Sequence, residues 1–280
     1  MKYKIEKNTV QETLIIPLYA RKVCSELYPN LYRDETAVRL IDEIDYDFSE
    51  AEKNSRGLMQ RFGSLEVAMR QNDLAFEVRD YLKSHPNAAV VNLGCGLDST
   101  GRSCDNGSCK IYNLDFPDVI AVRNELLPAG EREENIPCDL NNTEWFGKID
   151  SSNGAVFFAS GVFYYFLTEQ VKALVQGMAD AFPGGVLVFD AANRTAVKMI
   201  AKTWLKSAKI QDVGAYFAVS DAPQEISAWD SRLQVTSRGY MLGYTDLKDP
   251  SVSRFFRFLA KVGDGMMKMQ IVKIRFGGKQ

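Results

Sequence analysis

The sequence predicts an α/β protein built on a doubly wound, mostly parallel sheet, and two observations lead to this class. From about residue 74 to residue 200, short apolar runs alternate with stretches whose apolar residues recur at helical spacing. A turn with two glycines, Gly94-Cys95-Gly96, directly follows the first of these runs. In open α/β sheets this is where ligands bind. We therefore expect one domain over residues 1–280, with a binding core at residues 74–200.

Five apolar runs are expected to form strands. They cover residues 88–93 (AAVVNL), 110–114 (KIYNL), 135–140 (NIPCDL), 155–159 (AVFFA) and 186–189 (VLVF). Their nearly continuous apolar character is typical of strands that are buried on both faces. The third run is the weakest candidate because Pro137 interrupts it.

Helical spacing marks the segments between the strands. Leu74, Val78 and Tyr81 form one apolar stripe, and residues 171–178 carry another that Thr168 is placed to cap. Residues 1–60 are helical in character and are expected to cap the sheet. Residues 226–236 and 267–276 lack helical spacing, and we expect them to supply an antiparallel edge pair within residues 225–280.

Composition and charge exclude several functions. A net charge of -2 and a pI of about 5.7 give no field that would attract nucleic acid. No run of 18 apolar residues exists, so no membrane helix is expected. The N-terminus lacks signal-peptide features, which predicts a cytoplasmic protein with reduced cysteines. No metal site is expected, because the single histidine, His85, lies in a predicted loop away from the cysteines.

The glycine turn is the strongest functional feature. Asp115 ends the next predicted strand, nineteen positions after Gly96, where a carboxylate can accept hydrogen bonds from both ribose hydroxyls of an adenosine-containing ligand. A dinucleotide-binding turn would have a third glycine where this sequence has Ser99. S-adenosylmethionine has no phosphate and does not need that glycine. The alternatives are an NAD-type oxidoreductase and a structural turn without a cofactor.

Four blocks of the sequence carry a resemblance to a known family. They are VVNLGCGLDST, YNLDFPDVIAVRNELLP, PCDL and FFASGVFYYFLTEQVKALV, and their order and spacing resemble the leucine carboxyl methyltransferase superfamily. The bacterial branch that includes tetracenomycin-type polyketide O-methyltransferases is closer, and the similarity extends over about residues 11–200. The resemblance implies a Rossmann-like class I methyltransferase fold, with a seven-stranded sheet, helices on both faces and an N-terminal helical cap. It also implies S-adenosyl-L-methionine as the cofactor.

The resemblance implies roles for individual residues. Arg70 matches the arginine that holds the methionine carboxylate, a task suited to a bidentate guanidinium. Asp139 and Leu140 match a pair beside the adenine, and Ser160 stands where the family usually has glutamate. The residues expected to contact the cofactor are Arg70, Gly94, Cys95, Gly96, Asp115, Phe116, Asp139, Leu140 and Ser160.

The acceptor of the methyl group is expected to be a small molecule. A carboxylate is already ionised at neutral pH and needs no general base, and the sequence offers no well-placed histidine. This favours a carboxylate or an acidic hydroxyl, and no catalytic side chain is assigned. The residues expected to line the acceptor pocket are Tyr19, Arg21, Tyr164 and Tyr165. A non-catalytic S-adenosylmethionine-binding protein stays open as a further alternative, and the sequence does not indicate an oligomeric state.

Overall fold

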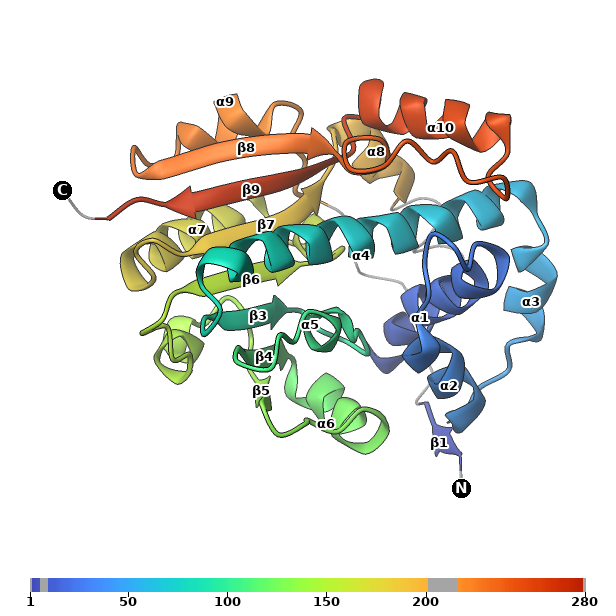
Figure 1. Ribbon diagram of the computed structural model, residues 1–280, viewed down its shortest axis with the longest axis horizontal. Helices are drawn as coiled ribbons and strands as arrows, with labels where there is room; N and C mark the ends of the chain where they lie inside the picture. Colours follow the sequence, from blue (N-terminus) through green and yellow to red (C-terminus); the bar gives the residue numbers. More distant parts are fainter. Residues whose placement is uncertain (1, 6–9, 201–215, 279–280) are drawn as a thin grey trace.

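The computed structural model describes residues 2–5, 10–200 and 216–278 of the chain (Figure 1). The strands are β1 (Tyr3–Lys4), β2 (Ile44–Asp45), β3 (Ala89–Leu93), β4 (Lys110–Asp115), β5 (Glu133–Pro137), β6 (Ala155–Ala159), β7 (Val186–Ala191), β8 (Leu233–Gly239) and β9 (Gln270–Phe276). The α-helices are α1 (Val10–Leu27), α2 (Glu35–Glu43), α3 (Ser49–Ser55), α4 (Leu58–Ser84), α5 (Thr100–Ser103), α6 (Pro117–Leu126), α7 (Thr168–Ala181), α8 (Arg194–Ile200), α9 (Ala222–Ser227) and α10 (Arg254–Gly265). Two 3-10 helices are η1 (Thr143–Lys148) and η2 (Phe163–Tyr165).

The main sheet has seven strands among the described residues, in the order β5-β4-β3-β6-β7-β9-β8. Neighbouring strands from β5 to β7 are parallel, and β9 is antiparallel to both β7 and β8. The chain order reverses between β3 and β6, which is the switch point where such sheets bind ligands. The predicted mostly parallel, seven-stranded α/β sheet is confirmed.

The predicted strands at 88–93, 110–114, 155–159 and 186–189 are present with small shifts at their ends. The third run differs more, because β5 covers Glu133–Pro137 and not residues 135–140. β5 is an edge strand, so the polar Glu133 and Glu134 can pair with β4 through their backbone, and the strand starts before the apolar run. Directly after Pro137 the chain turns, and the backbone carbonyl of Asp139 accepts a hydrogen bond from the Asn142 amide at 3.0 Å.

The C-terminal prediction is partly wrong. The strand expected at residues 226–236 starts later, because residues 226 and 227 belong to α9, a helix whose N-cap Asp221 accepts from the Gln224 amide at 3.1 Å. The strand follows later as β8, and it pairs with β9 in the expected antiparallel sense. Only β8 lies at the edge, since β9 is inserted between β7 and β8. Helix α7 begins one residue earlier than expected, because Leu167 and not Thr168 is at the N-cap.

Helices cover both faces of the sheet. Alternate residues of one strand point to opposite faces, so Val90 packs with α4 in one apolar cluster, and Val91 packs with α7 in another. A third cluster joins α1 and α2 to α6. The described residues contain no helix with the length and hydropathy needed to cross a bilayer.

Helices α1, α2 and α3 lie together at the end of the sheet toward which β3 points (Figure 1). They therefore stand over the carboxyl ends of the parallel strands. Helix α4 begins at Leu58 and runs without interruption to Ser84, so it crosses the boundary expected near residue 60. The division into a cap, a cofactor core and a C-terminal part stays a prediction.

Candidate cofactor-binding site

The glycine turn after β3 has a backbone conformation that requires glycine. Gly94 has φ 64° and Gly96 has φ 45°, both in the left-handed region. A Cβ on Gly94 would lie 2.6 Å from Cγ2 of Val162, and one on Gly96 would lie 3.1 Å from Cδ2 of Leu14. The two glycines thus let the turn pack closely against α1 and against the segment after β6. Cys95 between them is buried, and its thiol has a raised pKa because of that burial.

Asp115 at the end of β4 is joined directly to this turn. Its Oδ2 accepts a hydrogen bond from the Gly96 amide at 2.7 Å, and its Oδ1 accepts from the Phe116 amide at 2.8 Å. Each carboxylate oxygen has a second lone pair and can accept another hydrogen bond. Burial raises the pKa of this carboxyl although both amides act in the opposite direction. The Phe116 ring beside it is 46% exposed, a large apolar surface left open at the strand end.

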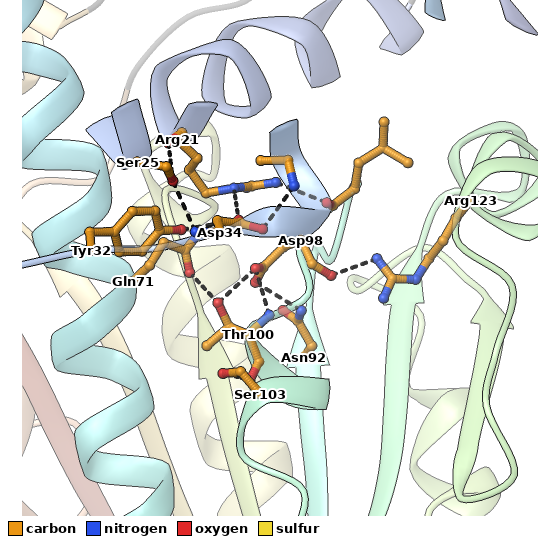
Figure 2. Close-up of polar contacts among 12 residues, drawn as sticks. Arg21, Ser25, Tyr32, Asp34, Gln71, Asn92, Asp98, Thr100, Ser103 and Arg123 are labelled. Carbon is orange, nitrogen blue, oxygen red and sulfur yellow. Dashed lines mark hydrogen bonds and ion pairs between the residues drawn. The ribbon is translucent and has the colours of Figure 1, made fainter. Parts of the chain in front are cut away.

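A network of buried polar side chains holds the backbone of the glycine turn in place (Figure 2). Arg123 of α6 donates from Nη1 to the carbonyl oxygens of Gly96 at 2.9 Å and of Asp98 at 2.8 Å. The Asp98 carboxylate accepts from the Thr100 amide at 2.8 Å and from Asn92 Nδ2 at 3.1 Å. These contacts fix the backbone on both sides of Gly96.

Arg21 belongs to the same network and not to a pocket wall. Its Nε donates to Asp34 Oδ2 at 2.9 Å, and its Nη2 donates to the Leu97 carbonyl at 2.9 Å. The side chain is 3% exposed. The sequence predicts Arg21 in the lining of the acceptor pocket, and this prediction is wrong. The structure instead uses its guanidinium to tie α1 and the start of α2 to the glycine turn.

Arg70 of α4 lies at the carboxyl end of β7. Its Nη1 donates to Asp190 Oδ2 at 3.1 Å, and its Nε has no hydrogen-bond partner in the part of the chain that the structure describes. Asp190 Oδ1 accepts from the Gly161 amide at 2.6 Å. The Ser160 hydroxyl next to it is buried and likewise has no partner among the described residues.

The predicted adenine pair, Asp139 and Leu140, follows β5 next to Asp115. The backbone there is held by a hydrogen bond from the Cys138 amide to the Asp115 carbonyl at 2.8 Å. The Asp139 side chain is exposed and accepts from the Asn141 amide at 2.9 Å, whereas Leu140 is buried. The predicted cofactor residues other than Arg70 therefore lie at the carboxyl ends of β3, β4, β5 and β6, and Arg70 comes from α4.

The predicted acceptor residues are more scattered. Tyr164 is buried, and burial together with the nearby Asp190 carboxylate raises its pKa well above the ordinary value. Tyr165 is 46% exposed. Tyr19 is half-buried and stacks on Phe48 with ring centroids 5.5 Å apart, so it packs within the helical cap.

Two depressions in the described surface lie near the predicted binding regions. One of about 420 Å³ lies between α1 and α2, has a largely charged lining that includes Arg33 and Asp42, and is not part of the strand-end site. The other, of about 250 Å³, lies beside η2 and α8. It is lined by Leu167, Thr168, Arg194, Val197, Lys198 and Tyr216. No cluster of three or more metal-ligating side chains occurs within residues 2–5, 10–200 and 216–278.

Sequence reasoning missed the residues that support the site. Arg123, Asn92 and Thr100 carry no motif, and their roles depend on contacts between elements that are distant in sequence. Asp98 gave the clearest available signal, because a polar residue two positions after a glycine turn is suited to capping the short helix that follows.

A sheet of this strand order, with a glycine turn and an acid at the ends of its two central neighbours β3 and β4, defines a class of protein. It is the class of Rossmann-like, S-adenosylmethionine-dependent methyltransferases.

Comparisons with known proteins identify the family. The sequence model described as leucine carboxyl methyltransferase matches residues 17–179, and the chain belongs to this family. It is 28% identical over 183 residues to the tetracenomycin polyketide synthesis O-methyltransferase TcmP of Streptomyces glaucescens, covering 65% of this chain and 66% of that protein. It is 25% identical over 258 residues to the S-adenosyl-L-methionine-dependent methyltransferase dpfgK of Gibberella zeae, and this match covers 86% of this chain and 85% of that protein.

A solved structure agrees on the fold. The crystal structure of a candidate methyltransferase from Thermobifida fusca has a TM-score of 0.57 at 17% identity and covers 92% of this chain and 94% of its own. The family assignment makes the protein an S-adenosylmethionine-dependent methyltransferase. It contradicts the NAD-type oxidoreductase and favours an enzyme over a binding protein without activity.

Proposed function

We propose that the protein is an O-methyltransferase that methylates a carboxylate of a small molecule, with S-adenosylmethionine bound at the carboxyl ends of β3, β4 and β6. The observation that supports the cofactor's position best is the Asp115 carboxylate, which the Gly96 amide holds at 2.7 Å beside the glycine turn. This arrangement leaves acceptor capacity on the carboxylate for the two hydroxyls of a ribose.

The other residues at this edge suit the same ligand. Buried polar atoms normally have a hydrogen-bond partner, yet Ser160 Oγ and Arg70 Nε have none in the described parts of the chain. Arg70 is suited to the methionine carboxylate, and the exposed Phe116 ring offers an apolar surface to the adenine. We infer that Asp139, whose Oδ1 accepts from the Asn141 amide, offers its other oxygen to the adenine amine.

Methyl transfer to an ionised acceptor does not require a side chain that acts as a general base. Bound S-adenosylmethionine supplies a methyl group that is already activated for in-line displacement. The protein has to align the acceptor and exclude water. His85 stacks on Tyr81 at 4.3 Å at the C-terminal end of α4, the end opposite the glycine turn, so it is not a base for this site. An acceptor that is ionised at neutral pH needs none.

An anionic acceptor also fits the depression beside η2. The cations Arg194 and Lys198 lie one turn apart on α8, and the half-exposed Tyr216 ring faces the same space. The Tyr216 amide donates to the Tyr164 carbonyl at 2.7 Å, which connects this wall to η2 and the end of β6. We infer a flat or aromatic carboxylic acid as the acceptor. The related TcmP is named as an O-methyltransferase of polyketide synthesis.

Methyl transfer to a panel of aromatic carboxylic acids and phenols tests this proposal. Label from S-adenosylmethionine should enter a carboxylic acid, and mild base should release it as methanol because the product is an ester. A base-stable product would indicate methylation of a hydroxyl and would contradict the carboxylate assignment.

We also propose a cytoplasmic location, because all five cysteines lie in the described chain as free thiols.

A further inference from the structure

Three groups from different elements converge on the carboxylate of Asp190 at the end of β7. Arg70 of α4 donates to Oδ2 at 3.1 Å, and the Gly161 amide donates to Oδ1 at 2.6 Å. The Tyr164 side chain of η2 also lies near this carboxylate, and burial and the carboxylate together raise the pKa of the Tyr164 hydroxyl. The Asp190 side chain is 1% exposed and that of Arg70 is 15% exposed. The inner partner is therefore sealed from water, while part of the Arg70 side chain stays exposed.

Arg70 and the turn after β6 share Asp190 as a hydrogen-bond partner, and they also pack directly against each other. Gly161 has φ 71°, and a Cβ at this position would lie 3.0 Å from Arg70 Nη1 and 3.1 Å from Nη2. The guanidinium lies against bare backbone that only glycine leaves accessible. A displacement of Arg70 would therefore also displace the turn that carries Ser160.

The carboxylate that faces Arg70 comes from the strand next to β6. Ala159 pairs with Phe189 in the parallel register, which brings the next residues, Ser160 and Asp190, side by side at the strand ends. Ser160 has a short neutral side chain whose hydroxyl finds no partner in the described structure. Asp190 supplies the negative charge that position 160 of this chain lacks.

We propose that Asp190 is a positioning residue for cofactor binding. It holds Arg70 through Nη1 and leaves the other guanidinium donors directed at the carboxylate of the S-adenosylmethionine tail, and it fixes the Gly161 turn at the same time. A prearranged donor loses less conformational entropy when the ligand binds. Asp190 acts through Arg70 and the turn and does not itself contact the cofactor. This inference rests on the proposed role of Arg70.

A double-mutant cycle on the binding of S-adenosylhomocysteine, followed by calorimetry, tests this proposal. Asp190→Asn keeps the shape and removes the charge that anchors Arg70. We expect its Kd to rise by roughly tenfold or more, as for loss of a hydrogen bond to a charged group. In an Arg70→Ala background the same change should add less than about twofold, because Asp190 then has no guanidinium to position.

Controls separate the possible failures. Asp180→Asn breaks an arginine–carboxylate pair of 2.7 Å with Arg232, outside the site, and should leave the Kd unchanged. If Asp190→Asn does not fold, Asp190→Glu, which keeps the charge on a longer side chain, is taken through the same cycle and should give an intermediate Kd.

Three outcomes would overturn the inference: an unchanged Kd, a tighter Kd, or a full additive loss in the Arg70→Ala background. A tighter Kd would show that Asp190 competes with the cofactor for Arg70. If Arg70→Ala itself binds normally, the proposed placement of the cofactor tail is wrong, which is a different failure.

Discussion

The Asp115 carboxylate and the Gly96 amide, nineteen residues apart in the sequence, are joined by a hydrogen bond of 2.7 Å. The bond connects the ends of the adjacent strands β3 and β4 and sets the turn and the acid in a fixed relation. Because Arg123 holds the carbonyl of the same glycine at 2.9 Å, both polar groups of the Gly96 backbone are engaged. The Gly96 backbone at the proposed ribose site is therefore held on both sides by groups of the protein itself.

Replacing Asp115 should weaken cofactor binding without unfolding the protein. Asp115→Asn keeps the side-chain size but removes the charge and one acceptor oxygen. We expect the Kd for S-adenosylhomocysteine to rise by about 10- to 100-fold, from loss of charged hydrogen bonds to the ribose. The matched control is Asp118→Asn, an exposed acid in the first turn of α6. Equal Kd values for the two variants would rule out Asp115 as the ribose ligand.

The glycine at position 94 should be required for stability as well as for binding. Gly94→Ala combines positive φ with a clash against Val162, whereas Gly107→Ala has φ 84° and no atom within 4 Å of its Cβ. We expect losses in the free energy of unfolding of about 3 kcal/mol and about 1 kcal/mol respectively, measured in urea. Val162→Ala should restore part of the larger loss. Similar losses at both glycines would mean that the turn can move away from Val162.

Asp73 should make the protein less stable as the pH rises. It is 3% exposed, and burial, with Asp264 and Glu77 nearby, raises its pKa to about 9. The unfolded chain loses this proton near pH 4, while the folded chain keeps it until about pH 9. The carboxyl therefore lowers the free energy of unfolding progressively across this window.

The variant Asp73→Asn removes that slope. In chemical denaturation it should match the parent protein near pH 4 and exceed it by at least about 1 kcal/mol at pH 8. A constant difference between variant and parent from pH 4 to pH 8 would show that Asp73 does not titrate in this range.

The cations of α8 should affect the acceptor and not the cofactor. With an aromatic carboxylic acid that the enzyme methylates, the double variant Arg194→Gln and Lys198→Gln should raise KM about fivefold, because exposed charges contribute about 1 kcal/mol or less each. The increase should shrink at high salt, and the Kd for S-adenosylhomocysteine should stay constant. Lys83→Gln, at the exposed C-terminal end of α4, is the control. If KM is unchanged in both variants, the acceptor enters elsewhere.

The sequence predicted the parts of the fold that depend on local pattern. Apolar runs predict the strands β3, β6 and β7. The positions of Gly96 and Asp115 after two such runs predict that both lie at strand ends. β5 begins before its apolar run because it is the edge strand of the sheet, where the polar Glu133 and Glu134 pair with β4 through their backbone. The prediction that Arg21 lines the acceptor pocket is wrong, because a lone arginine in a helical pattern does not reveal the buried Asp34 with which it pairs. Such pairs form only when distant elements pack, so no local pattern signals them.

A crystal structure with S-adenosylhomocysteine tests the central claim most directly. We predict that both ribose hydroxyls lie within about 3 Å of the Asp115 carboxylate oxygens, with the tail carboxylate on Arg70. Density for the adenosyl group at another place, with Asp115 bound only to the amides of Gly96 and Phe116, would contradict it.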